Sequence, residues 1–325
     1  MNSPLMVEAT DLGAADLATL LNRLLDNIGS VVLGKPEVIK LAVVALLAEG
    51  HVLVEDVPGM GKTLLARAIA ASIDCSFRRL QFTPDLLPSD ILGSSVYNAG
   101  TGDFIFKPGP IFANVILADE VNRTTPRTQS ALLEAMSDGQ VSVEGNTHIL
   151  ERPFLVIATQ NPYEFEGTYV LPESQLDRFM IRLRMGYPLR SEERRVLSTH
   201  RSGEPVETLR PVVTGEEIRQ LQRAVRKVRV DDAITEYLLD IVHATRDGDE
   251  LNVGVSTRGA LTLYRAAQGL ALVSGRDYIV PDDIKTLAVP VLSHRVVGKS
   301  FLQAGEFGAA EAIIRDIVDR LRVPS

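Results

Sequence analysis

The segment that most limits the fold is residues 51–70, HVLVEDVPGMGKTLLARAIA. It begins with an apolar strand over 51–55, continues through a loop over 56–61 that contains two glycines, and ends in a helix over 62–73. A strand joined to a helix by so short a loop is typical of parallel α/β sheets. The loop also presents backbone N–H groups at a helix start, where they can bind phosphate oxygens.

This loop matches the phosphate-binding motif G-x-x-x-x-G-K-[ST] except at its first position, where Asp56 replaces glycine. Gly59 and Gly61 occupy the places where the backbone must approach phosphate closely. The first position lies at the strand end, farther from the phosphates, so Asp56 does not exclude the motif. We predict that Lys62 binds the β- and γ-phosphates and that the Thr63 hydroxyl ligates magnesium. The alternative is a glycine-rich turn followed by a surface lysine.

A second chemical feature is an apolar strand that ends in two adjacent carboxylates, VILADE over 115–120. Acidic side chains at the end of a buried strand cost free energy unless they have a function. We predict that Asp119 holds the shell of a magnesium ion and that Glu120 polarises the attacking water. An exposed strand end that happens to be acidic is the alternative, and the phosphate-binding loop upstream makes it the weaker one.

Three further polar residues are candidates for the same site, and each also has a structural explanation. Asn161 ends the apolar segment VIATQN and could orient water near the γ-phosphate, but Asn before Pro is also a common turn. Arg178 follows Asp177 and could be an arginine finger supplied to a neighbouring subunit. Arg258 lies near the start of a helix and could reach back to the γ-phosphate. For both arginines the alternative is a solvated surface residue.

The first part of the chain alternates between helices and buried strands, which predicts a doubly wound parallel sheet. Helices are expected at 16–33, 36–50 and 126–139. Strands are expected at 77–82, at the end of the segment 111–120, at 154–161 and at 179–185. Two inserts, 92–112 and 140–153, alternate as β-hairpins do, and hairpins added to an α/β core usually carry partner contacts.

The second part of the chain reads as helices joined by short loops, with no further strands. Helices are expected at 215–228, 231–246, 256–275 and 281–295. We therefore place a domain boundary near Pro188, which gives a nucleotide-binding core over 1–188 and an all-helical lid over 189–325.

Composition restricts the partners and the location. The 325 residues carry a formal net charge of −8, which argues against a broad nucleic-acid-binding surface. A single cysteine, Cys75, excludes an intrachain disulfide and suits a reducing compartment. No signal-peptide pattern and no transmembrane segment is visible, so a cytoplasmic location is expected. The histidines show no metal-ligand spacing and are interpreted as structural or surface residues: His51, His148, His200, His243 and His294.

Four segments together resemble MoxR-family AAA+ ATPases, which share two hairpin inserts with magnesium-chelatase subunits. They are VEDVPGMGKT, ILADEVNRTTPRTQSALLEAMSDGQV, IATQNPYEFEGTYVLPESQLDRFMIRL and STRGALTLYRAAQGLAL. The likeness extends over nearly the whole chain, from about residue 25 to 310. An aspartate at the position of Asp56 is usual in this family, which implies a variant of the loop that still binds nucleotide.

The resemblance implies an AAA+ P-loop core, with a parallel sheet flanked by helices, and an all-helical lid domain. It implies ATP and Mg²⁺ bound between them, at the junction of subunits in a homo-oligomeric ring that is usually a hexamer. By position, Lys62 and Thr63 match Walker A, Asp119 and Glu120 match Walker B, Asn161 matches sensor 1, Arg178 the trans finger and Arg258 sensor 2. Val32 and Gly34 match the stretch that lies near adenine in the family, and further cofactor contacts are assigned to Pro58, Gly59, Met60, Gly61 and Leu64.

For function, the resemblance implies Mg-dependent ATP hydrolysis used for chaperone-like remodelling, maturation, or metal or cofactor insertion into partner proteins, including partners with a von Willebrand A domain. Two other classes stay open: a DNA-associated AAA+ motor, and a nucleotide-gated scaffold with little turnover. The acidic balance counts against the motor. The combination of Glu120, Asn161 and Arg178 counts against the scaffold.

Overall fold

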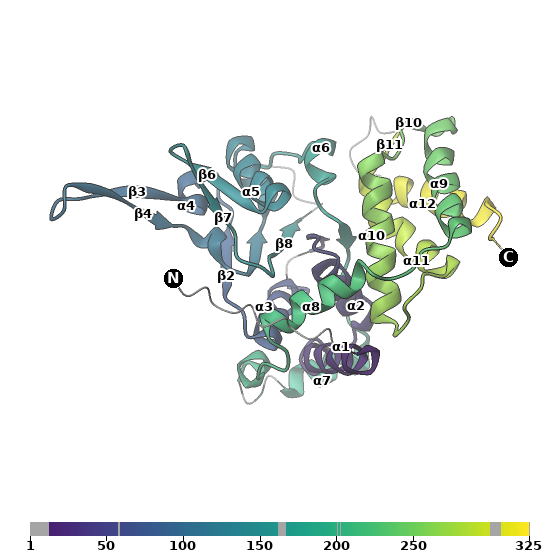
Figure 1. The fold of residues 1–325 in the computed structure, drawn as a ribbon, viewed down its shortest axis with the longest axis horizontal. Coiled ribbons are helices and arrows are strands. Elements are labelled where there is room, and N and C mark those ends of the chain that lie inside the picture. Colours follow the sequence, from purple (N-terminus) through teal and green to yellow (C-terminus); the bar gives the residue numbers. More distant parts are fainter. Residues whose placement is uncertain are drawn as a thin grey trace, which may run out of the picture.

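The computed structural model describes residues 13–57, 59–161, 167–199, 201, 203–299 and 307–324. A five-stranded parallel sheet lies at the centre, in the order β2-β5-β8-β1-β9 (Figure 1). Its strands are Val52–Glu55 (β1), Phe77–Gln81 (β2), Val115–Asp119 (β5), Leu155–Gln160 (β8) and Ile181–Leu183 (β9). The predicted α/β class with a parallel sheet is confirmed.

The sheet separates two hydrophobic cores. Every residue of β1 and β8 is buried, as expected for parallel strands that helices cover on both faces. Side chains along a strand alternate between faces, so Val52 and Val54 belong to one cluster and Leu53 to the other.

Helices of the α/β part fill both cores. The helices α1, α2 and α3 supply apolar side chains to the cluster that contains Val52, and α4 and α5 supply the cluster that contains Leu53. Their bounds, with that of the short α6, are Ala14–Gly29 (α1), Pro36–Leu47 (α2), Lys62–Ile73 (α3), Pro88–Leu92 (α4), Pro126–Asp138 (α5) and Glu173–Leu176 (α6).

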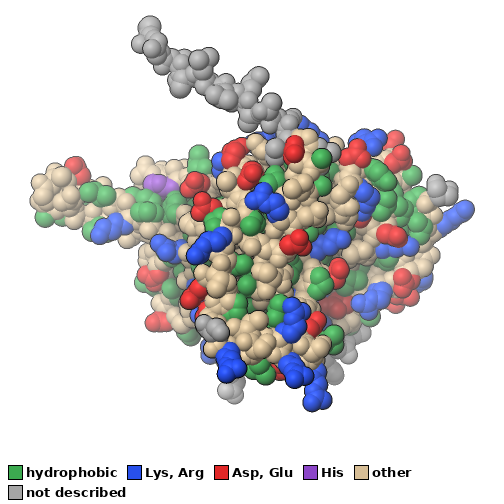
Figure 2. Space-filling view, turned by 90° about the horizontal axis from the view of Figure 1, so that it is seen from below, with side chains coloured by type: hydrophobic (Ala, Val, Ile, Leu, Met, Phe, Trp, Pro, Cys, Tyr) green, Lys and Arg blue, Asp and Glu red, His purple; other side chains and the backbone are tan. Residues whose placement is uncertain are grey.

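Both predicted hairpins are present. The first consists of Gly93–Asn98 (β3) and Asp103–Pro108 (β4), and it projects far from the body (Figure 1). Tyr97 and Phe104 pair across it with ring centroids 5.5 Å apart, and both side chains are exposed. Hydrophobic side chains line this arm on the face in Figure 2. An apolar arm of this kind is typical of a protein-contact surface.

The second hairpin consists of Gln140–Val143 (β6) and Asn146–Ile149 (β7), and it follows α5 directly. Its His148 ring stacks on Phe106 of β4 with centroids 4.0 Å apart, and Phe112 meets the same imidazole edge-on. The two inserts therefore contact each other through aromatic side chains.

Helices dominate the chain after β9, as predicted. They are Arg190–Thr199 (α7), Gly215–Val225 (α8), Asp232–Asp247 (α9), Thr257–Val273 (α10), Pro281–Leu292 (α11) and Phe307–Arg320 (α12). Asp231 caps α9 by accepting a hydrogen bond from Ala233 N–H (2.9 Å), and Ser256 caps α10 by accepting one from Gly259 N–H (3.0 Å).

The expectation that strands end before this part of the chain is wrong. Leu251–Val253 (β10) and Val297–Gly298 (β11) form a short antiparallel pair. Strands of two or three residues are too short to show the alternation that marks a strand in a sequence.

One apolar cluster joins the lid to the sheet. It extends from the sheet face through α2 into α8, α10 and α11. Gln222 of α8 donates a hydrogen bond to the Leu46 carbonyl at the end of α2 (2.8 Å). Gly269 lets α10 approach α2 closely, because a Cβ there would lie 3.3 Å from Val44 Cγ1. The hydrophobic core is therefore continuous across the predicted domain boundary near Pro188, and that boundary stays a prediction.

A buried ionic network forms a second connection. Arg182 of β9 is 7% exposed and lies 3.4 Å from the Glu55 carboxylate of β1 and 2.9 Å from Glu311 of α12. Gln160, the last residue of β8, donates a hydrogen bond to Glu55 (2.5 Å). Removing one partner of a buried ion pair leaves an uncompensated charge, so this network fixes β1, β8 and α12 relative to one another.

His51 precedes β1 and is enclosed between α5 and β8. Its Nδ1 accepts a hydrogen bond from Val156 N–H (3.1 Å), and its Nε2 lies 3.0 Å from the Met136 carbonyl oxygen. Burial lowers the pKa of His51 from 6.5 to about 4, although the contact with Met136 opposes this shift. His294 is also buried and its pKa is also lowered, while His200 lies outside the described residues.

The buried His51 predicts acid sensitivity of the fold. Because its pKa is lower in the folded state, the unfolded chain binds more protons between about pH 6.5 and 4, so stability present above this window is lost as pH falls through it. We expect a loss of about 2–3 kcal/mol from this residue between about pH 7.5 and 4.5. His51→Gln keeps a donor and an acceptor and should flatten the pH dependence of the free energy of unfolding in urea. Equal pH dependence in both proteins would assign the effect to other groups.

In the described part of the chain, no helix combines the length and the apolar character that crossing a bilayer requires.

Candidate active site

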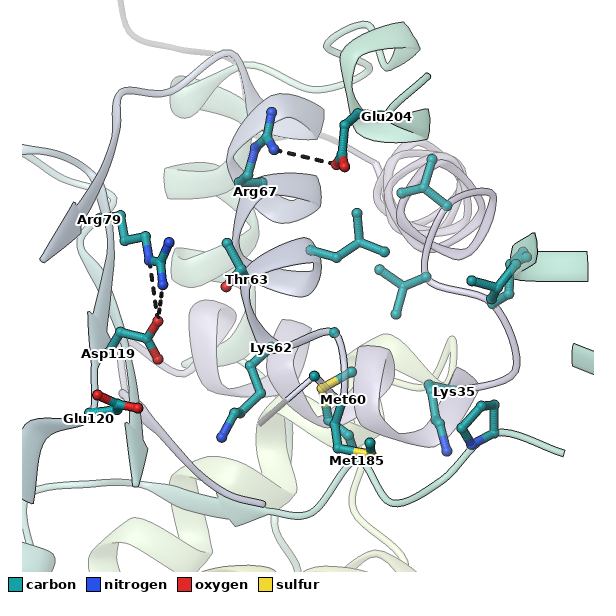
Figure 3. A pocket seen from close by; sticks show the side chains of 18 of the residues that line it. Lys35, Met60, Lys62, Thr63, Arg67, Arg79, Asp119, Glu120, Met185 and Glu204 are labelled. Carbon is teal, nitrogen blue, oxygen red and sulfur yellow. Dashed lines mark hydrogen bonds and ion pairs between the residues drawn. The ribbon is translucent and has the colours of Figure 1, made fainter. Parts of the chain in front are cut away.

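A cavity of about 530 Å³ opens beside the carboxyl ends of β1, β5 and β8. This edge is where ligands bind in open parallel sheets. The cavity is lined by most of the residues predicted from the sequence, several of which Figure 3 labels. They are Val32, Gly59, Met60, Gly61, Lys62, Thr63, Leu64, Asp119, Glu120 and Asn161. Pro58, also predicted, lies outside the described residues.

The glycines of the loop are required by its backbone conformation. Gly59 and Gly61 have φ of +86° and +88°, in the left-handed region that other residues adopt only with strain. Gly61 directly precedes α3, so the loop turns its N–H groups toward the cavity at the start of that helix. The arrangement is the one expected of a phosphate-binding loop.

Asp56, the departure from the motif, has a structural role. Its carboxylate accepts hydrogen bonds from Val57 N–H (2.9 Å) and from Gly186 N–H (2.7 Å). The side chain thus ties the start of the loop to the segment after β9, which glycine could not do. Its backbone carbonyl accepts a hydrogen bond from Lys62 Nζ (2.8 Å), so the lysine rests on its own loop.

Lys62 is partly buried in the cavity wall. Burial lowers the pKa of its amine below the usual value, and the nearby carboxylates of Asp119, Asp56 and Glu120 oppose that shift. The ammonium group can bind an anionic ligand. A cation that arrives with this ligand would offset the negative charge of the three carboxylates.

Asp119 and Glu120 are held by the neighbouring strands. Thr159 of β8 donates its hydroxyl to Asp119 Oδ1 (2.6 Å) and accepts a hydrogen bond from Glu120 N–H (3.0 Å). Glu120 has φ of +58°, a left-handed conformation that costs about 1 kcal/mol or more for a residue other than glycine. Its carboxylate accepts hydrogen bonds from Gln81 (2.7 Å) and Arg123 (3.0 Å). The backbone conformation of Glu120 and the hydrogen bonds from Gln81 and Arg123 therefore fix the orientation of its carboxylate.

Arg79, Gln81 and Thr159 were not predicted, and all three act on the acidic pair. Arg79 donates to Asp119 Oδ2 from Nη2 (2.6 Å) and Nε (3.2 Å), as Figure 3 shows. Arg79 and Gln81 lie outside the four segments that carry the resemblance, and Thr159 lies in one of them, two positions before Asn161. A usable signal exists for Gln81 and Thr159, because both lie at the carboxyl ends of predicted parallel strands, where site residues gather.

The residues predicted to lie near adenine fall in two places. Val32 lines the cavity together with Met60, and the unpredicted Met185 and Val196 extend this apolar wall. Gly34 lines a neighbouring hollow instead. Its φ of +73° explains this glycine, because other residues adopt that conformation only with strain, and the Glu192 carboxylate of α7 fills the space beside it.

The two predicted arginines are not among the residues that line the cavity. Arg258 Nε lies 3.8 Å from Asp177 Oδ2, and its Nη2 lies 3.5 Å from Ser137 Oγ. Arg178 is the next residue after Asp177 and is partly exposed. Buried Arg295 holds Asp177 through Oδ1 (2.8 Å), and burial lowers the pKa of Arg295 to about 10. Arg258 and Arg295 therefore both contact Asp177, the residue that precedes Arg178 in the chain.

Among the described residues, no group of three or more His, Cys, Asp and Glu side chains is arranged to hold a metal ion. A cation at the cavity would depend on fewer protein ligands and on ligand phosphates, as Mg²⁺ commonly does.

Comparison with known proteins agrees with this geometry. The profile of the "ATPase family associated with various cellular activities (AAA)" matches residues 51–181, and an AAA lid domain profile matches 243–317. YeaC of Bacillus subtilis is 53% identical over 95% of this chain and 96% of its own length. The chaperone MoxR1 of Mycobacterium tuberculosis is 38% identical over 96% of this chain and 84% of its own.

A solved structure gives the same answer for the fold. A crystal structure from Cytophaga hutchinsonii, whose name proposes an ATPase, superimposes with a TM-score of 0.88 and is 36% identical; 96% of this chain and 97% of that chain are covered. The family assignment therefore rests on both the sequence and the arrangement of core and lid. The chain belongs to the MoxR family of AAA+ ATPases.

Proposed function

We propose that the cavity binds ATP with Mg²⁺ and hydrolyses its terminal phosphate. The observation that supports this most directly is the meeting of Lys62, Thr63, Asp119, Glu120 and Asn161 at one cavity, since they come from three separate segments. Lys62 leaves the Asp56 carbonyl to meet the β- and γ-phosphates. Glu120 accepts a proton from the attacking water, and Asn161 orients that water.

The donor set fits Mg²⁺. Thr63 and Asp119 both line the cavity and offer oxygen atoms, which are the ligands that this hard cation prefers. The bound cation would neutralise charge that develops on the phosphate oxygens. Thr159 contributes indirectly, because its hydroxyl fixes the orientation of the Asp119 carboxylate.

We further propose that Arg178 acts on the cavity of a neighbouring subunit in a homo-oligomeric ring, with six subunits as the expected number. Arg258 pairs with Asp177, the residue before Arg178, and neither arginine lines its own cavity. The contact of Arg258 with the segment that carries Arg178 favours the same assignment for Arg258, in place of a reach back to its own γ-phosphate. Arg295 would keep the segment that carries Arg178 attached to the lid.

For the task of the ring, we propose chaperone-like remodelling, maturation, or metal or cofactor insertion in a protein client, including clients with a von Willebrand A domain. The name of MoxR1 as a chaperone supports the general role. The exposed apolar side chains of the β3–β4 arm are suited to contact a polypeptide. A cytoplasmic location stays part of this proposal.

The test is the ATPase rate per subunit measured against protein concentration, with mass photometry on the same samples. A site completed by a neighbour should show a rate that rises as the ring assembles. Independent subunits would give a constant rate and remove the trans role of Arg178. Stimulation by DNA that weakens with salt would instead favour the DNA-associated motor, and an assembled ring without turnover would favour the nucleotide-gated scaffold.

A further inference from the structure

Both oxygens of the Asp119 carboxylate already have donors within the chain. Thr159 donates to Oδ1 at 2.6 Å, and Arg79 donates to Oδ2 from Nη2 at 2.6 Å and from Nε at 3.2 Å. Two N–H groups of one guanidinium thus converge on a single oxygen. Both partners are charged, which accounts for the short 2.6 Å hydrogen bond from Nη2.

Arg79 lies on the edge strand β2 and lines the same cavity. Its side chain is 50% exposed, whereas that of Asp119 is 13% exposed. Nη2 also donates to Gln81 Oε1 (3.2 Å), and Gln81 in turn donates to Glu120 (2.7 Å). The guanidinium therefore pairs directly with Asp119, as Figure 3 shows, and is linked to Glu120 through Gln81.

We propose that Arg79 competes with the divalent cation for Asp119, and so sets the cation concentration at which the site becomes active. This rests on the proposed role of Asp119 in holding Mg²⁺. A cation held by Asp119, directly or through water, must approach a carboxylate of which Arg79 already occupies one oxygen with two N–H groups. A guanidinium and a cation that share one carboxylate also repel each other, because both are positively charged.

The cation can replace Arg79 at Asp119 because the Arg79 side chain is in contact with solvent. Half of its side chain is exposed, so the guanidinium can turn into water without opening a core. Exposed ion pairs contribute little, so removing this one should strengthen cation binding by about two- to fivefold. In the absence of the cation, Arg79 also limits repulsion between the Asp119 and Glu120 carboxylates.

The experiment measures cation binding directly. Mn²⁺ is titrated into full-length protein with equimolar ADP, and bound Mn²⁺ is followed by electron paramagnetic resonance. Arg79→Ala should bind Mn²⁺ about two- to fivefold more tightly than wild type, with the difference shrinking at high salt. Arg79→Lys should give an intermediate Mn²⁺ affinity, because lysine keeps the positive charge but lacks the paired N–H groups of the guanidinium.

Arg78→Ala is the matched control. It removes the same charge from the neighbouring position, which faces the other side of the strand and does not line the cavity. Mn²⁺ affinity that rises equally in Arg78→Ala and Arg79→Ala would reflect net charge alone and overturn the proposal. Unchanged or weaker Mn²⁺ binding by Arg79→Ala would also overturn it.

A separate pair of variants tests the site on which the proposal rests. Thr63→Ala and Asp119→Asn should each weaken Mn²⁺ binding in the presence of ADP. If neither does, the proposed cation site is wrong. If both do while Arg79→Ala matches wild type, the site stands and only the competition by Arg79 fails.

Discussion

Glu120→Gln is expected to lower ATP turnover by about 10²- to 10⁴-fold while ATP binding is retained. The amide has nearly the same shape as the carboxylate but cannot accept the proton of water at neutral pH. Its oxygen can still accept hydrogen bonds from Gln81 and Arg123, so the geometry of the cavity should persist. Phosphate release measures turnover, and a fluorescent ATP analogue measures binding.

The control for this variant is Glu134→Gln, an exposed position on α5 that does not line the cavity. It should turn over ATP as wild type does. Turnover near the wild-type rate in Glu120→Gln would mean that another group takes the proton. Loss of ATP binding together with turnover would instead mean that Glu120 supports the structure of the loop.

Arg178→Ala should reduce turnover in assembled rings by about 10³-fold without loss of ATP binding, because an arginine finger stabilises charge in the transition state alone. The decisive measurement mixes this variant with Glu120→Gln. Each inactive protomer carries the residue that the other lacks. Where an Arg178→Ala cavity faces the intact Arg178 of its neighbour, activity should return.

Arg127→Ala, on the exposed side of α5, serves as the control for removal of a surface charge. The mixing result separates two explanations of a slow Arg178→Ala ring. No recovery in mixed rings, with assembly verified by mass photometry, would place Arg178 outside the neighbour's site. Full activity of Arg178→Ala alone would remove the finger assignment altogether.

The elements that the sequence predicted well are those with a local physical signature. The loop over 56–61 combines two left-handed glycines with a helix start, and both features are set by residues close in sequence. The strand that ends at Asp119 is marked by a run of buried apolar residues. The hairpin turns are marked by Gly102 and Gly145, which have positive φ.

The contacts that were not predicted join residues far apart in the chain. Arg79 and Asp119 meet because β2 and β5 are neighbours in the sheet, and no spacing rule carries that information. The grouping of Arg258 with Asp177 depends on how α10 is placed against the core. Helical periodicity shows only which residues share one face of a helix. It does not show whether an arginine on that face points at its own cavity or elsewhere.

The apolar cluster that joins α2 to the lid has a consequence for biosynthesis. Gln222, which binds the end of α2, is separated from Leu46 by 176 positions, and Gly269 of α10 is still later in the chain. Domains generally fold as units during translation, the N-terminal one first. Here α2 cannot acquire its full packing until α10 has emerged from the ribosome. A chain released early, for instance by a premature stop codon near Pro188, would expose the α2 surface and be prone to aggregate.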